Sequence, residues 1–323
     1  MLDVTNQKAV LCDRRLNMKR LKLVLLFCLL AVSPLVVAAQ KSETGDQEAA
    51  AEKSNKDHTY IRIKRDDNKQ PVALQTALIK FKATRGPNRK AQVDLIGAIH
   101  IADADYYAEL NKIFKQYDVV LFELVAPEGV KIERGHKQEL SLNVISGSQQ
   151  GFQALLGLSH QIEQIDYQAE NFVHADMTPT EFSKHMKDRG ESFMQLYFRS
   201  IGQGLAMQGT EQGGSGDLGL LIALFSKDRE YNLKLIMAQQ FERMEGLPDV
   251  MSGPEGSTII TLRNDKALSV LKEQLTAGKQ RIGIFYGAGH FDDMEKKLVE
   301  DFRLQRYDEK WIDAWDLRRK KTQ

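Results

Sequence analysis

The sequence predicts an α/β fold in which pseudo-duplicated βαβ halves form a mixed central sheet, with a largely helical insertion between them. Near the start of the folded region, apolar strand-like runs alternate with amphipathic helical segments, and the same alternation returns near the end. The segments between carry apolar residues at helical spacing. The fold class therefore follows from the order of hydrophobic periodicities along the chain.

The N-terminal part of the chain is expected to lie outside this fold. Residues 18–39 combine a basic start, a short apolar run and a small-residue end, which is typical of a secretory signal peptide. With residues 1–17 they form an upstream extension and signal peptide, and residues 40–58 have the composition of a disordered linker. We expect an exported protein of the periplasm or cell envelope, anchored at its N-terminus if the signal is not cleaved.

Cysteine usage and charge exclude several classes of function. Both cysteines, Cys12 and Cys28, lie in the leader, so the processed chain has no thiol for disulfides, nucleophilic catalysis or zinc. Six of the 45 basic and two of the 44 acidic residues lie in residues 1–39, which leaves 39 against 42. We therefore expect no nucleic-acid partner, and no membrane span after signal cleavage.

The folded domain is expected to span residues 59–317, with a basic tail at 318–323. The first strands are predicted at Tyr60–Arg65, Thr76–Ala83, Gln92–Ile99 and Val119–Val125. Asp103 is expected to cap a helix over residues 104–117, ahead of the last of these strands. Strand, helix and strand in this order predict a βαβ unit.

The middle of the chain is helical in pattern, and the final unit repeats the first. Helices are predicted at residues 149–156, 179–186, 192–201, 218–247 and 264–277. The glycine-rich stretch 202–219 lacks the Lys-Ser/Thr ending of a phosphate-binding loop and is interpreted as a mobile loop or lid. A strand at 280–286 then precedes a helix at 293–302 capped by Asp292, and Trp311 and Trp315 are expected to pack together on a terminal helix.

A Gly-x-x-His motif follows a strand-like run in each half of the domain: Gly97-Ala98-Ile99-His100 and Gly287-Ala288-Gly289-His290. A glycine permits φ values or close backbone approach that a side chain forbids, and functional residues of open α/β sheets gather where strands end. Two imidazoles could thus enter one pocket, as a metal or hydrolytic site requires. A purely structural role for each histidine stays open. His136, His160, His174 and His185 lack this context, and we expect them at the surface or in contact with the site residues from outside the site.

Glu123 is a lone carboxylate within the apolar run Val119–Val125. Burying an unpaired carboxylate costs several kcal/mol or raises its pKa, so Glu123 needs a partner. A divalent cation shared with the two histidines would serve, and so would a buried arginine. The sequence pattern does not decide between the cation and the arginine as the partner of Glu123.

Together with the pair Arg263-Asn264, these motifs resemble the TraB/PrgY/GumN family, which is related to the Tiki membrane metalloproteases and to the erythromycin-esterase/ChaN-like superfamily. The resemblance covers most of residues 92–300. It implies an active site of His100, Glu123 and His290 with Arg263 beside them. It also implies a divalent ion of the Mn, Co or Zn type on those two histidines and the glutamate, and hydrolysis of a peptide, amide or ester.

Two other functions are compatible with the same residues. In a metal-free, esterase-like hydrolase, one histidine acts as base and the other as acid, with Glu123 orienting an imidazole. In a binding protein, as suggested for pheromone-shutdown members of the family, a peptide or signal is held without turnover. In the metal-dependent hydrolase, Arg263 would stabilise an oxyanion or grip a substrate carboxylate.

Overall fold

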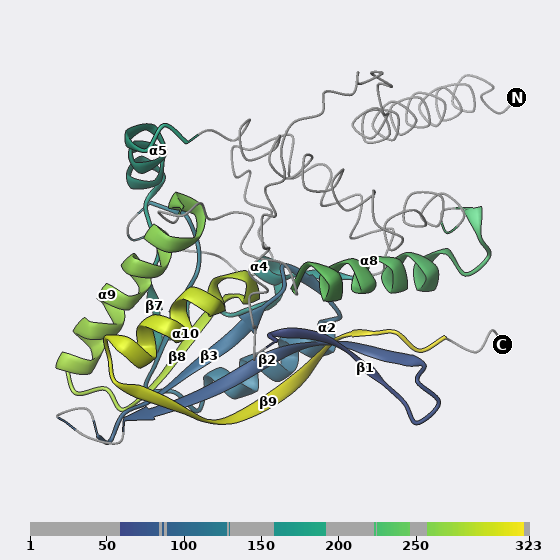
Figure 1. Ribbon diagram of the computed structural model, residues 1–323, viewed down its shortest axis with the longest axis horizontal. Helices are drawn as coiled ribbons and strands as arrows, with labels where there is room; N and C mark the ends of the chain where they lie inside the picture. The colour runs from purple at the N-terminus through teal and green to yellow at the C-terminus, as the bar shows by residue number, and fades with distance from the viewer. Residues whose placement is uncertain are drawn as a thin grey trace, which may run out of the picture. The chain divides into compact units, whose positions relative to one another are not determined.

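The computed structural model describes residues 59–83, 86, 89–127, 129, 158–191, 223, 225–245 and 257–319. It shows an α/β fold with a mixed sheet of seven strands, which confirms the predicted fold class (Figure 1). The internal duplication stays a prediction. The expected signal peptide and linker, the helices at 149–156 and 192–201 and the glycine-rich loop at 202–219 lie outside the described residues.

The central sheet joins an antiparallel part to a parallel part. Its strands run in the order β1 (Ile61–Arg65), β2 (Pro71–Ala83), β3 (Gln92–Ala98), β8 (Arg281–Gly287), β5 (Val119–Phe122) and β7 (Phe172–His174), and β9 (Leu304–Asp316) also pairs with β2. The long strand β2 is antiparallel to β1, β3 and β9. Strands β3, β8, β5 and β7 are parallel, so their carboxyl ends meet at one edge.

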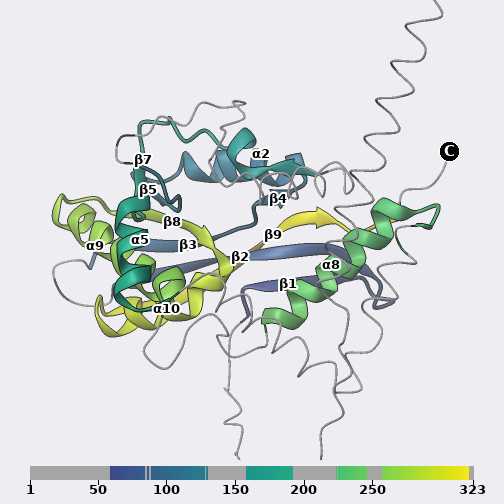
Figure 2. The ribbon, with the colours of Figure 1, turned by 90° about the horizontal axis from the view of Figure 1, so that it is seen from above.

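Helices cover both faces of this parallel part (Figure 2). Helix α2 (Ala104–Phe114) packs on one face, where its Leu110 and Phe114 join a core with Phe285 of β8. Helices α9 (Arg263–Thr276) and α10 (Phe291–Glu300) pack on the other face, around Ile284 of the same strand. Burial on both sides explains why the parallel strands are continuous apolar runs in the sequence.

The remaining elements border the sheet. Helix α8 (Arg229–Glu245) packs along β1, and its Glu242 accepts the backbone N–H of Ile63 at 3.0 Å. Helix α5 (Pro179–Asp188) follows β7 and begins with a Thr178/Glu181 capping box. The short strands β4 (Ile101–Ala102) and β6 (Ser159–His160) pair with each other, and α4 (Gln161–Gln164) follows them. No helix among the described residues is long and apolar enough to cross a membrane.

The expected terminal helix is wrong, because the segment forms β9. Trp311 lies opposite Ala77 of β2 and Trp315 opposite Leu74, with a register shift between them. The shift places Trp315 in the core on the α2 face, while Trp311 packs against the opposite core. The two tryptophans are four residues apart, as in a helical pair, but the register shift turns them to opposite faces of the sheet.

The two Gly-x-x-His turns also differ from expectation. After β3 the chain bends at His100 before it enters β4, whereas after β8 it enters a short 3-10 turn, η2 (Ala288–His290). The cap of α10 is therefore His290 rather than Asp292, which lies in the first turn. Asp103 precedes α2 as predicted but makes no side-chain cap, because its carboxylate accepts from Lys234 and the backbone of Asp316.

Candidate functional site

Four neighbouring parallel strands each lead to a polar residue at the same edge of the sheet. Two residues after β3 comes His100, His290 follows β8 through η2, Glu123 directly follows β5, and Asp176 lies two residues after β7. The register holds the strand ends level, since Ala98 lies opposite Gly287 on the neighbouring strand. The predicted residues His100, Glu123 and His290 thus leave adjacent strands at their carboxyl ends, where open α/β sheets bind ligands.

Glu123 lies at the centre of the hydrogen-bond network at this edge. Its Oε1 accepts from Arg263 Nη2 at 2.8 Å, and its Oε2 accepts from the backbone N–H of Gly287 at 2.7 Å. Burial disfavours the charged carboxylate, but His290, Arg263 and His100 outweigh it and hold the pKa of Glu123 well below its usual range. Of the two partners that the sequence left open, the buried arginine is present.

Arg263 bridges two carboxylates. Its Nε donates to Asp176 Oδ1 at 2.9 Å and its Nη2 to Asp176 Oδ2 at 2.5 Å, beside the contact with Glu123. Burial opposes the charge of Arg263, but Asp176 and Glu123 raise its pKa further above the usual value. One guanidinium against two carboxylates leaves a net negative charge, which favours a proton or another cation nearby.

His290 completes the network from the β8 side. Its Nδ1 is 2.6 Å from Asn264 Oδ1, and its Nε2 lies 3.6 Å from Glu123 Oε1. The ring packs edge to face against Tyr286, at 5.2 Å between centroids, and the Tyr286 hydroxyl donates to the carbonyl of Ala175. The imidazole is therefore held on three sides, with its Nε2 toward the glutamate.

His100 is the exposed member of the set. Its Nδ1 is 3.3 Å from Gln161 Oε1, and the Gln161 amide nitrogen donates to the Tyr167 hydroxyl at 2.7 Å. In its protonated form, His100 would also lower the pKa of Glu123, after His290 and Arg263. Of the two histidines, His100 is thus the one open to solvent and to a substrate.

The glycines of the two motifs have different roles. Among the described residues, neither Gly97 nor Gly287 has a positive φ, so conformational freedom does not explain them. A Cβ on Gly97 would lie 3.0 Å from the carbonyl oxygen of Ala77 on β2, so close approach of the two strands requires this glycine. At Gly287 a Cβ would meet Glu123 Oε2 at 3.4 Å, an ordinary contact.

Asp176 is the functional residue that the sequence reasoning missed. It is fully buried and makes both of its ion-pair contacts with Arg263. The strand that precedes it, β7, has three residues and therefore shows no periodicity. A signal did exist, because Asp176 stands between an apolar run and the Thr178-Pro179-Thr180-Glu181 capping box, a strand-to-helix junction.

The other histidines do not join this network. His174 lies beside it, but its Nε2 contacts the carbonyl oxygen of Leu124 at 2.6 Å, which is a structural role for this half-buried histidine. His160 belongs to β6 and His185 to α5, and His136 lies outside the described residues. This separation supports the choice of His100 and His290.

The expected metal site stays a prediction. Within the part of the chain that the structure describes, no group of three or more His, Cys, Asp or Glu side chains has the spacing of a metal site. Both oxygens of Glu123 already accept hydrogen bonds, one of them from the Arg263 guanidinium. A cation on that oxygen would have to compete with a permanent positive charge.

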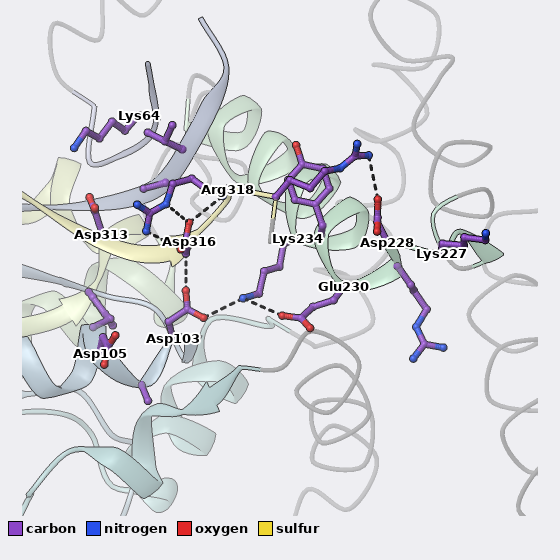
Figure 3. A pocket seen from close by; sticks show the side chains of 17 residues that line it. Lys64, Asp103, Asp105, Lys227, Asp228, Glu230, Lys234, Asp313, Asp316 and Arg318 are labelled. Atoms are coloured by element: carbon purple, nitrogen blue, oxygen red, sulfur yellow. Dashed lines mark hydrogen bonds and ion pairs between the residues drawn. The ribbon is translucent and has the colours of Figure 1, made fainter. Parts of the chain in front are cut away.

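A pocket of about 770 Å³ lies elsewhere, between α8, the start of α2 and the end of β9 (Figure 3). It contains none of the four predicted site residues. Its charged side chains pair largely with one another: Lys234 contacts Asp103 at 3.0 Å and Arg318 contacts Asp316 at 2.8 Å. We therefore take the sheet edge, and not this pocket, as the candidate functional site.

Comparisons with protein-family models, curated proteins and solved structures find no match for this chain. The functional inference therefore depends on the residues at the sheet edge.

Proposed function

We propose that the protein hydrolyses an amide or ester bond of a peptide or related small substrate at this sheet edge. The observation that carries the proposal is the pairing of an ionised, buried Glu123 with His290, whose Nε2 is 3.6 Å from the carboxylate, beside the exposed His100. A carboxylate next to imidazoles at the end of parallel strands supplies the groups that general acid–base hydrolysis needs.

In the metal-free mechanism, His100 is the base. Its Nδ1 faces Gln161, which leaves Nε2 to take a proton from water as that water attacks the substrate carbonyl. His290, after its Nε2 has taken up a proton beside the Glu123 carboxylate, is the acid that returns a proton to the leaving group. A positioned acid or base of this kind contributes about 10²–10⁴-fold to a rate.

Arg263 supports the developing negative charge. Its described ion pairs use Nε and Nη2, and Nη1 is in none of them. This nitrogen is the one that would donate to an oxyanion or to a substrate carboxylate. Asp176 and Glu123 hold the guanidinium in one orientation, so the donor is fixed in place before the substrate binds.

Hydrolysis with a divalent cation is the second candidate. The 3.6 Å between His290 Nε2 and Glu123 Oε1 is too long for a direct hydrogen bond, and two ligands of one ion at about 2.0–2.2 Å each can stand this far apart. His100, Glu123 and His290 would hold the ion, which would activate a water and polarise the carbonyl. The rest of the site would keep its roles.

Activity of the purified full-length chain tests both candidates. We expect hydrolysis within a panel of ester, amide and short peptide substrates, and its loss in His100→Gln and His290→Gln. Metal analysis and chelation then separate the two mechanisms. Activity of the metal-free protein would exclude the metal-dependent mechanism, whereas activity that is lost on chelation and restored by one metal ion would require it. Peptide binding that survives both substitutions, with no turnover of any substrate, would instead identify a binding protein.

A further inference from the structure

We infer that Asn264 and Gln161 are positioning residues that hold both histidines in the same tautomer, with the proton on Nδ1 and the lone pair on Nε2. This inference deepens the proposed function, because a base or a metal ligand needs that lone pair. It concerns two amide side chains to which the sequence assigned no role, and it can be measured without any substrate.

At His290 the amide orientation is fixed by its own donors. Asn264 is fully buried, and its amide nitrogen donates to the carbonyl of His290 at 3.1 Å and to Asp293 Oδ2 at 2.8 Å. Both partners accept hydrogen bonds only, so the nitrogen must face them and Oδ1 must face the imidazole. Because Oδ1 is an acceptor, the Nδ1 atom at 2.6 Å carries the proton.

At His100 the same contacts recur with Gln161. The backbone N–H of Gln161 donates to the carbonyl of His100 at 2.9 Å, and its side-chain oxygen faces His100 Nδ1 at 3.3 Å. The buried amide nitrogen of Gln161 is directed to the Tyr167 hydroxyl at 2.7 Å, which leaves the oxygen for the imidazole. In both cases one residue binds the histidine carbonyl and its Nδ1 together.

Holding Nδ1 in this way has a chemical consequence. The tautomer of an imidazole is set by the hydrogen bond of its other nitrogen, and such oxygen partners raise the basicity of the free nitrogen. For His290, the free Nε2 is the atom that faces Glu123. Without Asn264, the proton could move to Nε2 and bond to the carboxylate, and the site would lose its base or ligand atom.

His174 provides the opposite case in the same molecule. Its Nε2 lies 2.6 Å from the carbonyl oxygen of Leu124, so in the neutral form the proton must be on Nε2. The three rings therefore predict different signals: Nδ1–H for His100 and His290, and Nε2–H for His174. Free histidine in water also favours Nε2–H, so Nδ1–H at two sites would report an imposed state.

Nitrogen NMR of the full-length chain, with nitrogen-15 in the histidine rings, tests the inference at mildly alkaline pH. Resonances are assigned by their loss in His100→Gln, His290→Gln and His174→Gln. We expect an unprotonated Nε2 in His100 and His290 and a protonated Nε2 in His174. A protonated Nε2 in neutral His290 or His100 would overturn the assignment for that residue, whether or not the protein is an enzyme.

Substitutions separate positioning from folding. Asn264→Leu should abolish the Nδ1–H form of His290 and leave that of His100, and Gln161→Met should do the reverse. Each substitution should lower kcat about 10–100-fold with little change in KM. Asn264→Asp keeps an oxygen acceptor and should keep the tautomer. Asn171→Leu is the control, since Asn171 also donates to two carbonyls but contacts neither histidine. Unchanged tautomers of His290 in Asn264→Leu and of His100 in Gln161→Met would contradict the inference. If the wild type has the expected Nδ1–H tautomers but no hydrolytic activity, only the proposed function is contradicted.

Discussion

Arg263 and Asp176 form a two-point ion pair, with Nε 2.9 Å from Oδ1 and Nη2 2.5 Å from Oδ2. The Asp176 side chain is fully buried, so the pair fixes the plane of the guanidinium. Glu123 contacts the same Nη2, which joins residues from β7, β5 and α9 into one network. This network links the stability of the domain to the geometry of the proposed site.

Removing the arginine should therefore be costly. We expect Arg263→Met to lower the free energy of unfolding by about 3–5 kcal/mol, because Glu123 and Asp176 would remain buried without a cation. Arg281→Met is the matched control, since Arg281 pairs with Asp118 but its side chain is 62% exposed, and should cost about 1 kcal/mol or less. Denaturant titration of both variants measures the difference, and equal losses would contradict the account.

Acid should weaken the domain through Glu123. Its pKa is lowered in the folded state, so its contribution is complete above the unfolded value of about 4.3 and is lost as the pH falls toward the folded value. The free energy of unfolding, measured over a pH series, should fall more steeply below about pH 4.3 for the wild type than for Glu123→Gln. Parallel curves would show that Glu123 has no such contribution.

Asp94 should behave in the opposite way. Burial raises its pKa, although hydrogen bonds from Tyr117 and Gln92 partly offset this. A raised pKa means that its stabilising contribution is present below the unfolded value of about 3.9 and is lost as the pH rises through the folded value. Asp94→Asn keeps an acceptor for Tyr117 and should raise the free energy of unfolding at neutral pH. This gain in the free energy of unfolding should vanish in acid. A lower free energy of unfolding for Asp94→Asn than for the wild type at neutral pH would contradict the account.

The two motif glycines should respond differently to alanine. In Gly97→Ala the new Cβ would lie 3.0 Å from a carbonyl oxygen and 3.1 Å from Thr76 Cβ, both on β2, so we expect a loss of about 1–3 kcal/mol. Gly289→Ala meets nothing within 4 Å and should change stability by about 0.5 kcal/mol or less. Thermal unfolding of the two variants distinguishes them. A tolerated Gly97→Ala would show that β2 and β3 can separate without cost.

The sequence was most informative where an element is long and strongly patterned. Helices α2, α5 and α9 and the strands β1, β3 and β8 lie close to their predicted ranges, because the helices and β1 repeat their apolar residues at one period and β3 and β8 are mainly apolar runs. The error at β9 has a physical cause: its tryptophans are spaced four apart, which is typical of a helical pair, but they lie on opposite faces of a bulged strand. Short elements such as β7 carry too few residues to show a period.

Much of the candidate site could be predicted because its residues stand at strand ends. Glu123 was recognisable as a carboxylate beside an apolar strand, and His290 by the turn after β8. Asn264 and Gln161 could not be assigned in this way, because their roles depend on which side chain they meet across the fold. Such long-range partners are set by tertiary packing, and local sequence patterns do not record them.

The rate of hydrolysis in matched histidine variants tests the central claim most directly. For the best substrate of the full-length protein, we expect His290→Gln and His100→Gln to lower kcat/KM by about 10²-fold or more, as loss of a catalytic acid or base does. His185→Gln on α5, outside the network, should leave kcat/KM unchanged. Wild-type rates in both His100→Gln and His290→Gln would show that catalysis does not occur at this sheet edge.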